Sequence, residues 1–307
     1  MNPANPAMTL NSLPNEVFIQ ILSYFSTRAL LPLTSVNHRF HALVLRILHY
    51  RLLLSMPLKE YKLLLECFHP SSKLTEPHVF CKYLGTDGLN EHHDGTGLLY
   101  ENIDAAHHLG RVTGLYSRFR PEVSSDEEDE RGAIGSKFGF PPGKGEDDVI
   151  REVTLDGYED FSQLCVVANL VQVKPGTSLL LSASTIEDGF VRLWREWLRG
   201  QSERMKKTAE IDWEENSDKA QMFSDDDILW VDMSKTVGLK MRVRPKTWDP
   251  SLPVLIHQDD RDDDSWVGYE VILEELHIRS TRLLLAVEQS KEEQKIHQTN
   301  AMVIGVS

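Results

Sequence analysis

The sequence predicts an α+β protein in which a small three-helix module precedes a mainly β, sandwich-like domain with a long acidic, disordered loop. Apolar residues recur at helical spacing near the N-terminus. Short segments rich in β-branched and aromatic residues follow, separated by Pro, Gly, Asp and Ser. We therefore expect a disordered tail over residues 1–8, the helical module over 9–50 and the β-rich domain over 51–307, with a disordered insertion at 121–148.

The first predicted helix begins near Leu13. Pro14 suits the first turn, where its missing N–H removes no helical hydrogen bond, and Glu16 lies near the positive end of the helix dipole. Apolar residues then recur at the spacing of one helical face: Val17, Ile21, Leu22 and Phe25. The pattern is typical of a helix that presents this face to another surface.

Two further helices are predicted after a short break. A short segment covers about residues 29–34. The next pattern has apolar residues at helical spacing: Val36, Phe40, Leu43, Val44, Ile47 and Leu48. Pro57 ends any helix that reaches it. Because three short helices bury little surface alone, we expect the module to lean on a partner or on a neighbouring domain.

The stretch LNSLPNEVFIQILSYFSTRALLPLTSVNHRFHALV, residues 10–44, resembles an F-box. The family pattern has an LP-x-E opening, an apolar I-L-x-x-hydrophobic helix, a D/A-L-L-x-L second helix and a V-x-x-R-F/W segment near the third. The matching residues are Leu13, Pro14, Glu16, Val17, Ile21, Leu22, Phe25, Leu30, Leu31, Leu33, Val36, Arg39, Phe40 and Leu43.

This resemblance implies that the helices dock on a Skp1-like adaptor, and through it on a cullin, within an SCF-type ubiquitin ligase. An apolar face that fills a groove on a partner is a common mode of recognition. The residues expected to make or support the contact are Leu13, Pro14, Glu16, Val17, Ile21, Leu22, Leu30 and Leu31.

Pro32 departs from the family pattern, which prefers a polar residue in the second helix. Inside a helix a proline costs roughly 3 kcal/mol. The sequence is therefore compatible with a second helix that starts late, at about residues 29–31, or with an irregular turn at this point.

The remainder of the chain has the punctuation of strands and turns. Predicted strands cover residues 61–68, 79–84, 165–173, 178–182, 237–243 and 269–273. Residues 276–288 alternate imperfectly, so they are predicted as a strand with a helix as the alternative. Residues 190–198 and 202–212 have patterns compatible with helices. No repeat of fixed period occurs, which excludes WD-repeat and leucine-rich-repeat architectures.

Two charged stretches are expected to lie outside the core. Residues 121–148 contain SSDEEDERG, which cannot pack against apolar surface and predicts a disordered loop. Ser124 and Ser125 precede these acids, as the target residues of acidophilic kinases do, and we treat them as hypothetical phosphorylation sites. Residues 201–227 are also highly charged and form a candidate mobile excursion.

Charge separates the two parts of the chain. Residues 10–58 contain four arginines, no lysine and one acid, a charge of +3, which leaves −17 for the rest of a chain whose net charge is −14. An acidic chain repels phosphate backbones and anionic lipid, so neither nucleic acid nor a membrane is an expected partner. The first sixteen residues lack the apolar region of a signal peptide, and three unpaired cysteines suit a reducing compartment, so we expect a cytoplasmic or nuclear protein.

No catalytic, cofactor-binding or metal-ligating residues are predicted. The acids at 225–227 and 259–264 lack the spacing of a calcium loop, and the histidine pairs 92–93 and 107–108 have no companion ligands. Cys67, Cys81 and Cys165 have no nucleophile signature and are expected to be structural thiols. Tryptophans 194, 197, 213, 230, 248 and 266 all follow the first module. They could line a ligand-binding face, although core packing is the favoured interpretation.

Three functional hypotheses remain. The favoured one is a non-catalytic substrate receptor, which binds a Skp1-like adaptor through the first module and an unknown protein target through the β-rich domain. The second is an F-box scaffold that acts outside ubiquitination. The third is an enzyme within residues 51–307, which no motif in the sequence demands.

Overall fold

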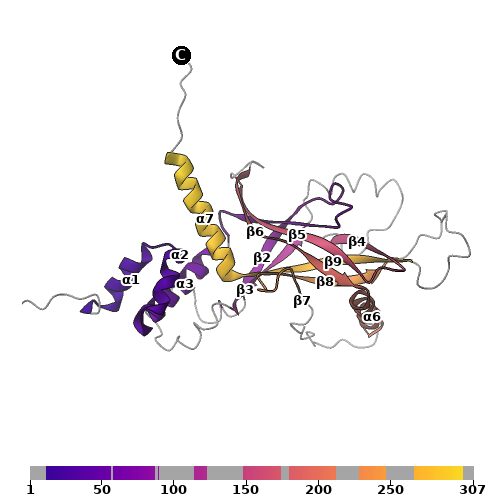
Figure 1. Cartoon of the computed structure of the whole chain (residues 1–307), viewed down its shortest axis with the longest axis horizontal. Coiled ribbons are helices and arrows are strands. Elements are labelled where there is room, and N and C mark those ends of the chain that lie inside the picture. The colour runs from indigo at the N-terminus through magenta and orange to yellow at the C-terminus, as the bar shows by residue number, and fades with distance from the viewer. Residues whose placement is uncertain are drawn as a thin grey trace, which may run out of the picture. The chain divides into compact units, whose positions relative to one another are not determined.

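The computed structural model describes residues 12–56, 58–86, 89, 114–122, 148–173, 180–211, 228–246 and 266–299. These residues belong to two compact units, each described separately (Figure 1). The helical unit contains α1–α3 and α7, and the β-rich unit contains β1–β9 and α6. The predicted tail at 1–8, residues 123–147 of the acidic insertion and residues 212–227 lie outside the described residues, as do the histidine pairs and acidic clusters named above.

In the helical unit, α1 (Asn15–Ser23) packs on α3 (His38–Ser55). The rings of Phe18 and Phe40 meet edge to face, with centroids 4.7 Å apart. Asn37 caps α3, because its side-chain oxygen accepts a hydrogen bond from the Phe40 backbone N–H at 2.9 Å. The remaining core of α3 is formed by Leu43, Val44, Ile47, Leu48 and Leu52.

Pro32 is accommodated by a change of helix type. The α-helix α2 (Thr27–Leu30) ends after four residues, and a 3₁₀ helix, η2 (Leu31–Ser35), continues the chain. Pro32 thus occupies the first turn of η2, where its missing N–H removes no required bond. The irregular turn is one of the two arrangements that the sequence left open.

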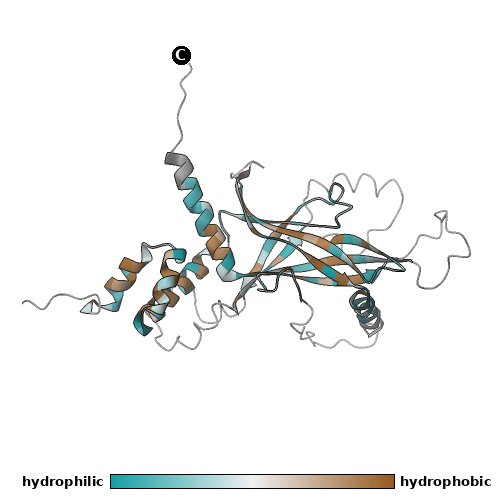
Figure 2. Ribbon diagram, in the orientation of Figure 1, coloured by the Kyte–Doolittle hydropathy of each residue, from teal (hydrophilic) through white to brown (hydrophobic). Residues whose placement is uncertain are grey.

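Helix α7 (Ser280–Thr299) belongs to the helical unit although it lies at the far end of the chain. It changes from hydrophobic to hydrophilic along its length (Figure 2). Glu288 of α7 accepts hydrogen bonds of 2.7 Å from the backbone N–H and the hydroxyl of Thr27, the first residue of α2. The same carboxylate lies 3.0 Å from the Arg51 guanidinium. One side chain thus joins α7, α2 and α3.

All nine described strands belong to one hydrogen-bonded sheet, with the order β6-β5-β1-β2-β3-β9-β8-β7 and β4 paired to β9 beside this path. The strands are β1 (Lys62–Phe68), β2 (Val79–Thr86), β3 (Tyr116–Glu122), β4 (Val149–Asp156), β5 (Phe161–Val173), β6 (Leu180–Trp194), β7 (Ile228–Trp230), β8 (Val237–Pro245) and β9 (Trp266–Arg279). Each pairing with a defined register is antiparallel. The α+β class is therefore confirmed, whereas the expected sandwich is corrected to one barrel-like sheet.

The sheet nearly closes on itself. Helix α6 (Arg195–Ile211) packs against both β6 and β8, which lie near opposite ends of the strand order. At Gly189 of β6, a Cβ atom would lie 2.6 Å from Cγ1 of Val231, which follows β7, so a larger residue would force Val231 to shift. Alternate side chains fill the interior, as in β4, where Val149, Val153 and Leu155 are buried.

Several element boundaries differ from their predictions. Residues 190–194 continue strand β6, and the helix expected at 190–198 begins only at Arg195. Residues 276–288 divide between the two alternatives, because β9 runs to Arg279 and α7 begins at Ser280. The acidic insertion was predicted to begin two residues early, since residues 121–122 lie in β3. Residues 201–211 were expected to belong to a mobile excursion, but they are helical.

Arg151 is a buried cation in the β-rich unit. Its side chain is 4% exposed and lies 3.7 Å from the Glu76 carboxylate. The guanidinium also donates hydrogen bonds to the backbone carbonyls of Cys67 and Pro77. It therefore joins β4 to β1 and to the segment before β2, which strand pairing does not connect to β4.

We expect Glu288→Ala to destabilise the helical unit by about 2 kcal/mol, because it removes charge-assisted hydrogen bonds and leaves Thr27 and Arg51 without this partner. Most of the described helical residues lie in that unit, whereas the described tryptophans, at 194, 197, 230 and 266, lie in the β-rich unit. Urea unfolding should therefore shift in far-UV circular dichroism with little change in tryptophan fluorescence. Glu292→Ala, an exposed change on the same helix, is the control and should shift neither signal.

We expect Arg151→Met to destabilise the β-rich unit, so that its effect appears in tryptophan fluorescence. Removing one partner of a buried ion pair costs about 3 kcal/mol, since the remaining charge and carbonyl groups lose their partners. The urea midpoint measured by tryptophan fluorescence should fall, and the exposed variant Arg120→Met should leave it unchanged. A midpoint equal to the wild type would show that the Arg151 contacts contribute no stability.

Candidate protein-binding site

Helix α1 carries two apolar faces. One face consists of Phe18, Ile19 and Leu22, which are buried in the core of the helical unit. The other consists of Val17 and Ile21, which are 40% and 41% exposed. Phe25, two residues after the helix ends, is 47% exposed. Val17 and Ile21 are four positions apart, which places them on one side of the helix. A nine-residue helix that carries apolar residues on a second side as well as on its core side leaves that second side for another surface to cover.

The Leu13–Pro14 turn that leads into α1 is held by Arg39 of α3. The Arg39 guanidinium donates hydrogen bonds to the Leu13 carbonyl and, at 2.9 Å, to the Asn15 side chain. Its carbon centre also lies 5.3 Å from the centroid of the Phe18 ring. Leu13 is half-buried and Pro14 is exposed. The turn is therefore held in place by Arg39, while Pro14 stays exposed to solvent.

The predicted contact residues fall into two groups. Pro14, Glu16, Val17, Ile21 and Leu31 are exposed and Leu13 is half-buried. Leu22 and Leu30 are 3% and 0% exposed. These two leucines lie in the core of their own unit, so any part they take in binding is to hold the exposed residues in place.

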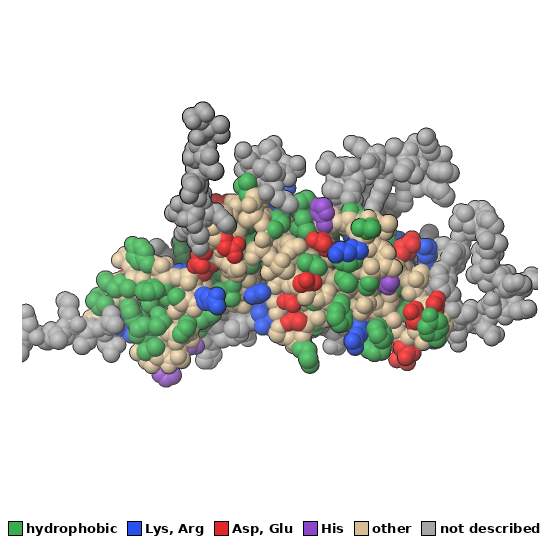
Figure 3. All heavy atoms as spheres, turned by 45° about the horizontal axis from the view of Figure 1, so that its top comes forward, with side chains coloured by type: hydrophobic (Ala, Val, Ile, Leu, Met, Phe, Trp, Pro, Cys, Tyr) green, Lys and Arg blue, Asp and Glu red, His purple; other side chains and the backbone are tan. Residues whose placement is uncertain are grey.

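The exposed apolar surface continues beyond α1. Leu31 begins η2 with 44% of its surface exposed, and Val36 at the end of η2 is 58% exposed. Tyr24, immediately after α1, is more exposed than either of them. Hydrophobic side chains cover much of the visible face of the helical unit (Figure 3). Contiguous apolar surface of this kind marks interaction sites on proteins.

Arg39 and Arg51 of this module are occupied in holding its structure. Arg39 binds the Leu13–Pro14 turn, and Arg51 pairs with Glu288 and donates to the Ser23 and Phe25 carbonyls. Arg28 in contrast is exposed. The positive charge counted in the sequence is therefore partly used inside the unit, and only a part of it is offered to a partner.

The described residues contain no group of three or more potential metal ligands. Burial raises the pKa of Cys67 to about 12, so this thiol stays protonated at neutral pH. Cys81 and Cys165 are half-buried. Across the helices described, none has the length and apolar character needed to cross a lipid bilayer.

One histidine lies beside a carboxylate, the arrangement that an enzyme hypothesis requires. Nε2 of His277 is 3.2 Å from Glu275, yet Lys240 and Arg118 lie 3.8 Å from the same carboxylate. Burial lowers the pKa of His277, and Glu275 opposes that shift. The carboxylate is already shared by two permanent cations, which is typical of a structural ion-pair network on a sheet.

Sequence reasoning missed the roles of two residues that shape this site. Arg39 is part of the matching pattern, but nothing in its spacing reveals that it binds the Leu13 carbonyl. Glu288 lies 237 residues after Arg51 and has no sequence signal at all. A charged residue at the start of α3 could have suggested the first role, whereas the second requires the folded chain.

A comparison with protein-family models matches residues 10–55 to the family described as F-box-like. The match ends at the residue where α3 ends, five residues beyond the boundary predicted from the sequence. No curated protein and no solved structure matches the chain. Residues 10–55 are thus an F-box-like domain, and the β-rich unit that accompanies it belongs to no assigned family.

Proposed function

We propose that this protein is a substrate receptor of an SCF-type ubiquitin ligase. Its F-box-like domain binds a Skp1-like adaptor, and through it a cullin, while the β-rich unit binds the target protein. The F-box-like match supports the adaptor and the ligase. The observation that carries the proposal is the uncovered apolar surface formed by Val17 and Ile21 of α1 and by Phe25 just after it.

The proposed contact has two layers. The outer layer touches the adaptor and consists of the predicted contact residues that are exposed or half-buried. They are Leu13, Pro14, Glu16, Val17, Ile21 and Leu31. Leu22 and Leu30 support them from the core. A few central apolar side chains dominate affinity in such interfaces, and the exposed Arg28 favours encounter with an acidic partner.

The mechanism is proximity, and the chain itself performs no chemistry. Binding the target and the ligase at once raises the effective concentration of target lysines near the conjugating enzyme. Orientation adds to this gain, because a bimolecular encounter becomes an intramolecular one. The burial and protonated state of Cys67 are in keeping with a non-catalytic role.

The adaptor contact can be tested with the full chain and a purified Skp1-like adaptor. We expect Ile21→Asp and Leu31→Asp to weaken binding by at least about thirtyfold, or about 2 kcal/mol, because each places a charge in an apolar interface. The control is Leu74→Asp, which changes a 99% exposed leucine of the β-rich unit and should bind as the wild type does. Isothermal titration calorimetry measures the affinity, and circular dichroism verifies that each variant is folded.

If folded Ile21→Asp bound the adaptor with the affinity of the wild type, the proposed contact surface would be contradicted.

Co-purification separates the two functional hypotheses. A complex that contains the adaptor and a cullin supports the ubiquitin-ligase receptor. A complex with the adaptor alone, under conditions where a known F-box protein retains its cullin, supports the scaffold that acts outside ubiquitination.

A further inference from the structure

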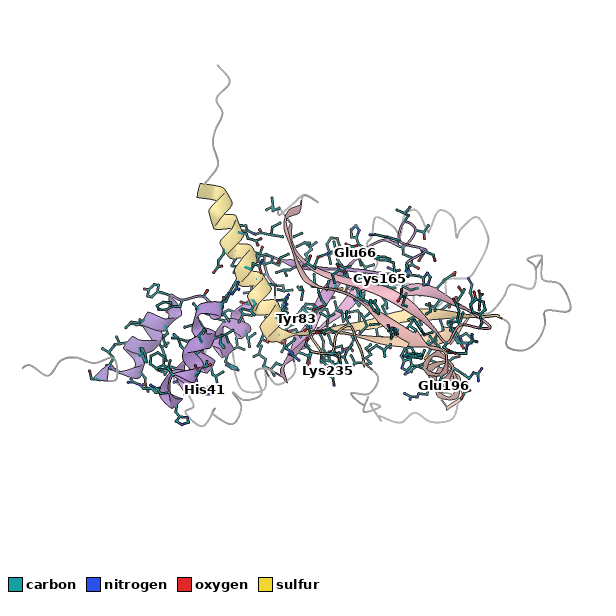
Figure 4. The ribbon with its side chains drawn as sticks, in the orientation of Figure 1. His41, Glu66, Tyr83, Cys165, Glu196 and Lys235 are labelled. Carbon is teal, nitrogen blue, oxygen red and sulfur yellow. The ribbon has the colours of Figure 1, made fainter. Side chains whose placement is uncertain are left out.

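The outer face of strands β5 and β6 carries an aromatic surface with an arginine at its centre. Strand register places Phe161 opposite Trp194, Gln163 opposite Arg192 and Cys165 opposite Phe190. The residues between them, Leu164, Val191 and Leu193, are buried in the interior. Since side chains alternate along a strand, the aromatic residues and Arg192 share the outward face. Figure 4 labels Cys165 at one end of this surface and Glu196, just beyond Trp194, at the other.

The aromatic rings on this surface are only partly covered. Phe161, Phe190 and Trp194 are 38%, 46% and 49% exposed. Rings of Phe161 and Trp194 pack together at 5.1 Å between centroids, inclined by 54°. The expectation that tryptophans serve the core therefore fails for Trp194, and the alternative of a ligand-binding face gains support.

Arg192 is held between two of these rings. Its guanidinium carbon lies 5.3 Å from the Phe161 centroid and 5.6 Å from the Phe190 centroid. Contact with two rings restricts the guanidinium and lowers the entropy lost when it binds a ligand. No described residue forms an ion pair with Arg192, and the exposed acids Asp160 and Asp188 on neighbouring positions are not bonded to it.

Two other arginines on the sheet surface differ from Arg192. Arg242 and Arg244 pair with Glu274 and Glu270 across the β8–β9 ladder. A guanidinium that is preorganised by aromatic rings but has no carboxylate partner retains its full capacity for a bidentate contact. The rings of Phe161 and Phe190 supply apolar area on both sides of the Arg192 guanidinium. The complementary ligand is therefore a carboxylate that is flanked by apolar groups.

We propose that Phe161, Phe190, Arg192 and Trp194 form the target-docking surface of the β-rich unit, and that it binds an acidic protein segment with apolar side chains next to its carboxylates. This inference rests on the proposed substrate-receptor function and names the chemistry of the target. The carboxylate pairs with Arg192, and the neighbouring apolar side chains cover Phe161 and Trp194. Burial of ring area supplies affinity, and the charged pair sets specificity.

The probe for this surface is a fluorescein-labelled peptide of alternating glutamate and leucine, with a peptide of alternating glutamine and leucine as its matched control. We expect the full chain to bind the glutamate peptide with a Kd of about 100 μM or tighter, measured by fluorescence anisotropy, and the glutamine peptide at least about tenfold more weakly. Binding of the glutamate peptide should weaken as salt is raised.

Three variants locate the contact. Arg192→Gln and Trp194→Ala should each weaken binding of the glutamate peptide by at least about tenfold. Arg192→Lys should give an intermediate loss, because it keeps the charge and loses the planar stacked group. The control Arg120→Gln removes an exposed arginine of β3 and should bind as the wild type does. Unchanged unfolding midpoints show that the variants are folded.

Equal binding by folded Arg192→Gln and wild type, or equal binding of the two peptides, would overturn the assignment. The test is independent of the adaptor contact. Arg192→Gln should bind the Skp1-like adaptor with wild-type affinity, whereas Ile21→Asp should bind the glutamate peptide normally. If the wild-type chain did not bind the Skp1-like adaptor, the proposed function would be refuted. The peptide measurements would then test the docking surface by themselves.

Discussion

Helix α1 carries apolar residues on two different sides, and the architecture of the helical unit follows from this constraint. Phe18, Ile19 and Leu22 must face α3 to form a core, so Val17 and Ile21 necessarily face away. Exposed apolar area is unfavourable in water, which makes a protein partner the natural means of covering it. The unit also needs its exposed side chains held in a fixed geometry, and Arg39 and Glu288 provide this with hydrogen bonds to the Leu13–Pro14 turn and to α2.

The two units offer surfaces of different chemistry. The helical unit exposes aliphatic side chains, whereas the outer face of β5 and β6 exposes rings around a cation. The adaptor proposed for the first surface and the acidic segment proposed for the second would therefore meet different side chains.

The sequence predicted those parts of the structure that depend on local pattern. Strands β1, β2 and β8 lie close to their predicted positions, and the F-box resemblance agrees with the family match. Predictions failed where one pattern permits two structures. FVRLW at 190–194 has apolar residues compatible with either element, and its pairing with β5 decides for a strand. The barrel-like closure was equally hidden, because period-two alternation occurs in sandwiches and barrels alike.

For the candidate site, the sequence by itself determined which residues are apolar and where the Leu-Pro turn opens the first helix, because these follow from composition and spacing. Only the tertiary structure decided which of them face outward. Leu22 and Ile21 are neighbours of similar hydrophobicity, yet one is buried and the other is 41% exposed. The same holds for the contact of Glu288 with Thr27 and for that of Arg192 with Phe161, which join separate segments of the chain. Burial and pairing across the chain arise from packing, and local pattern carries no record of them.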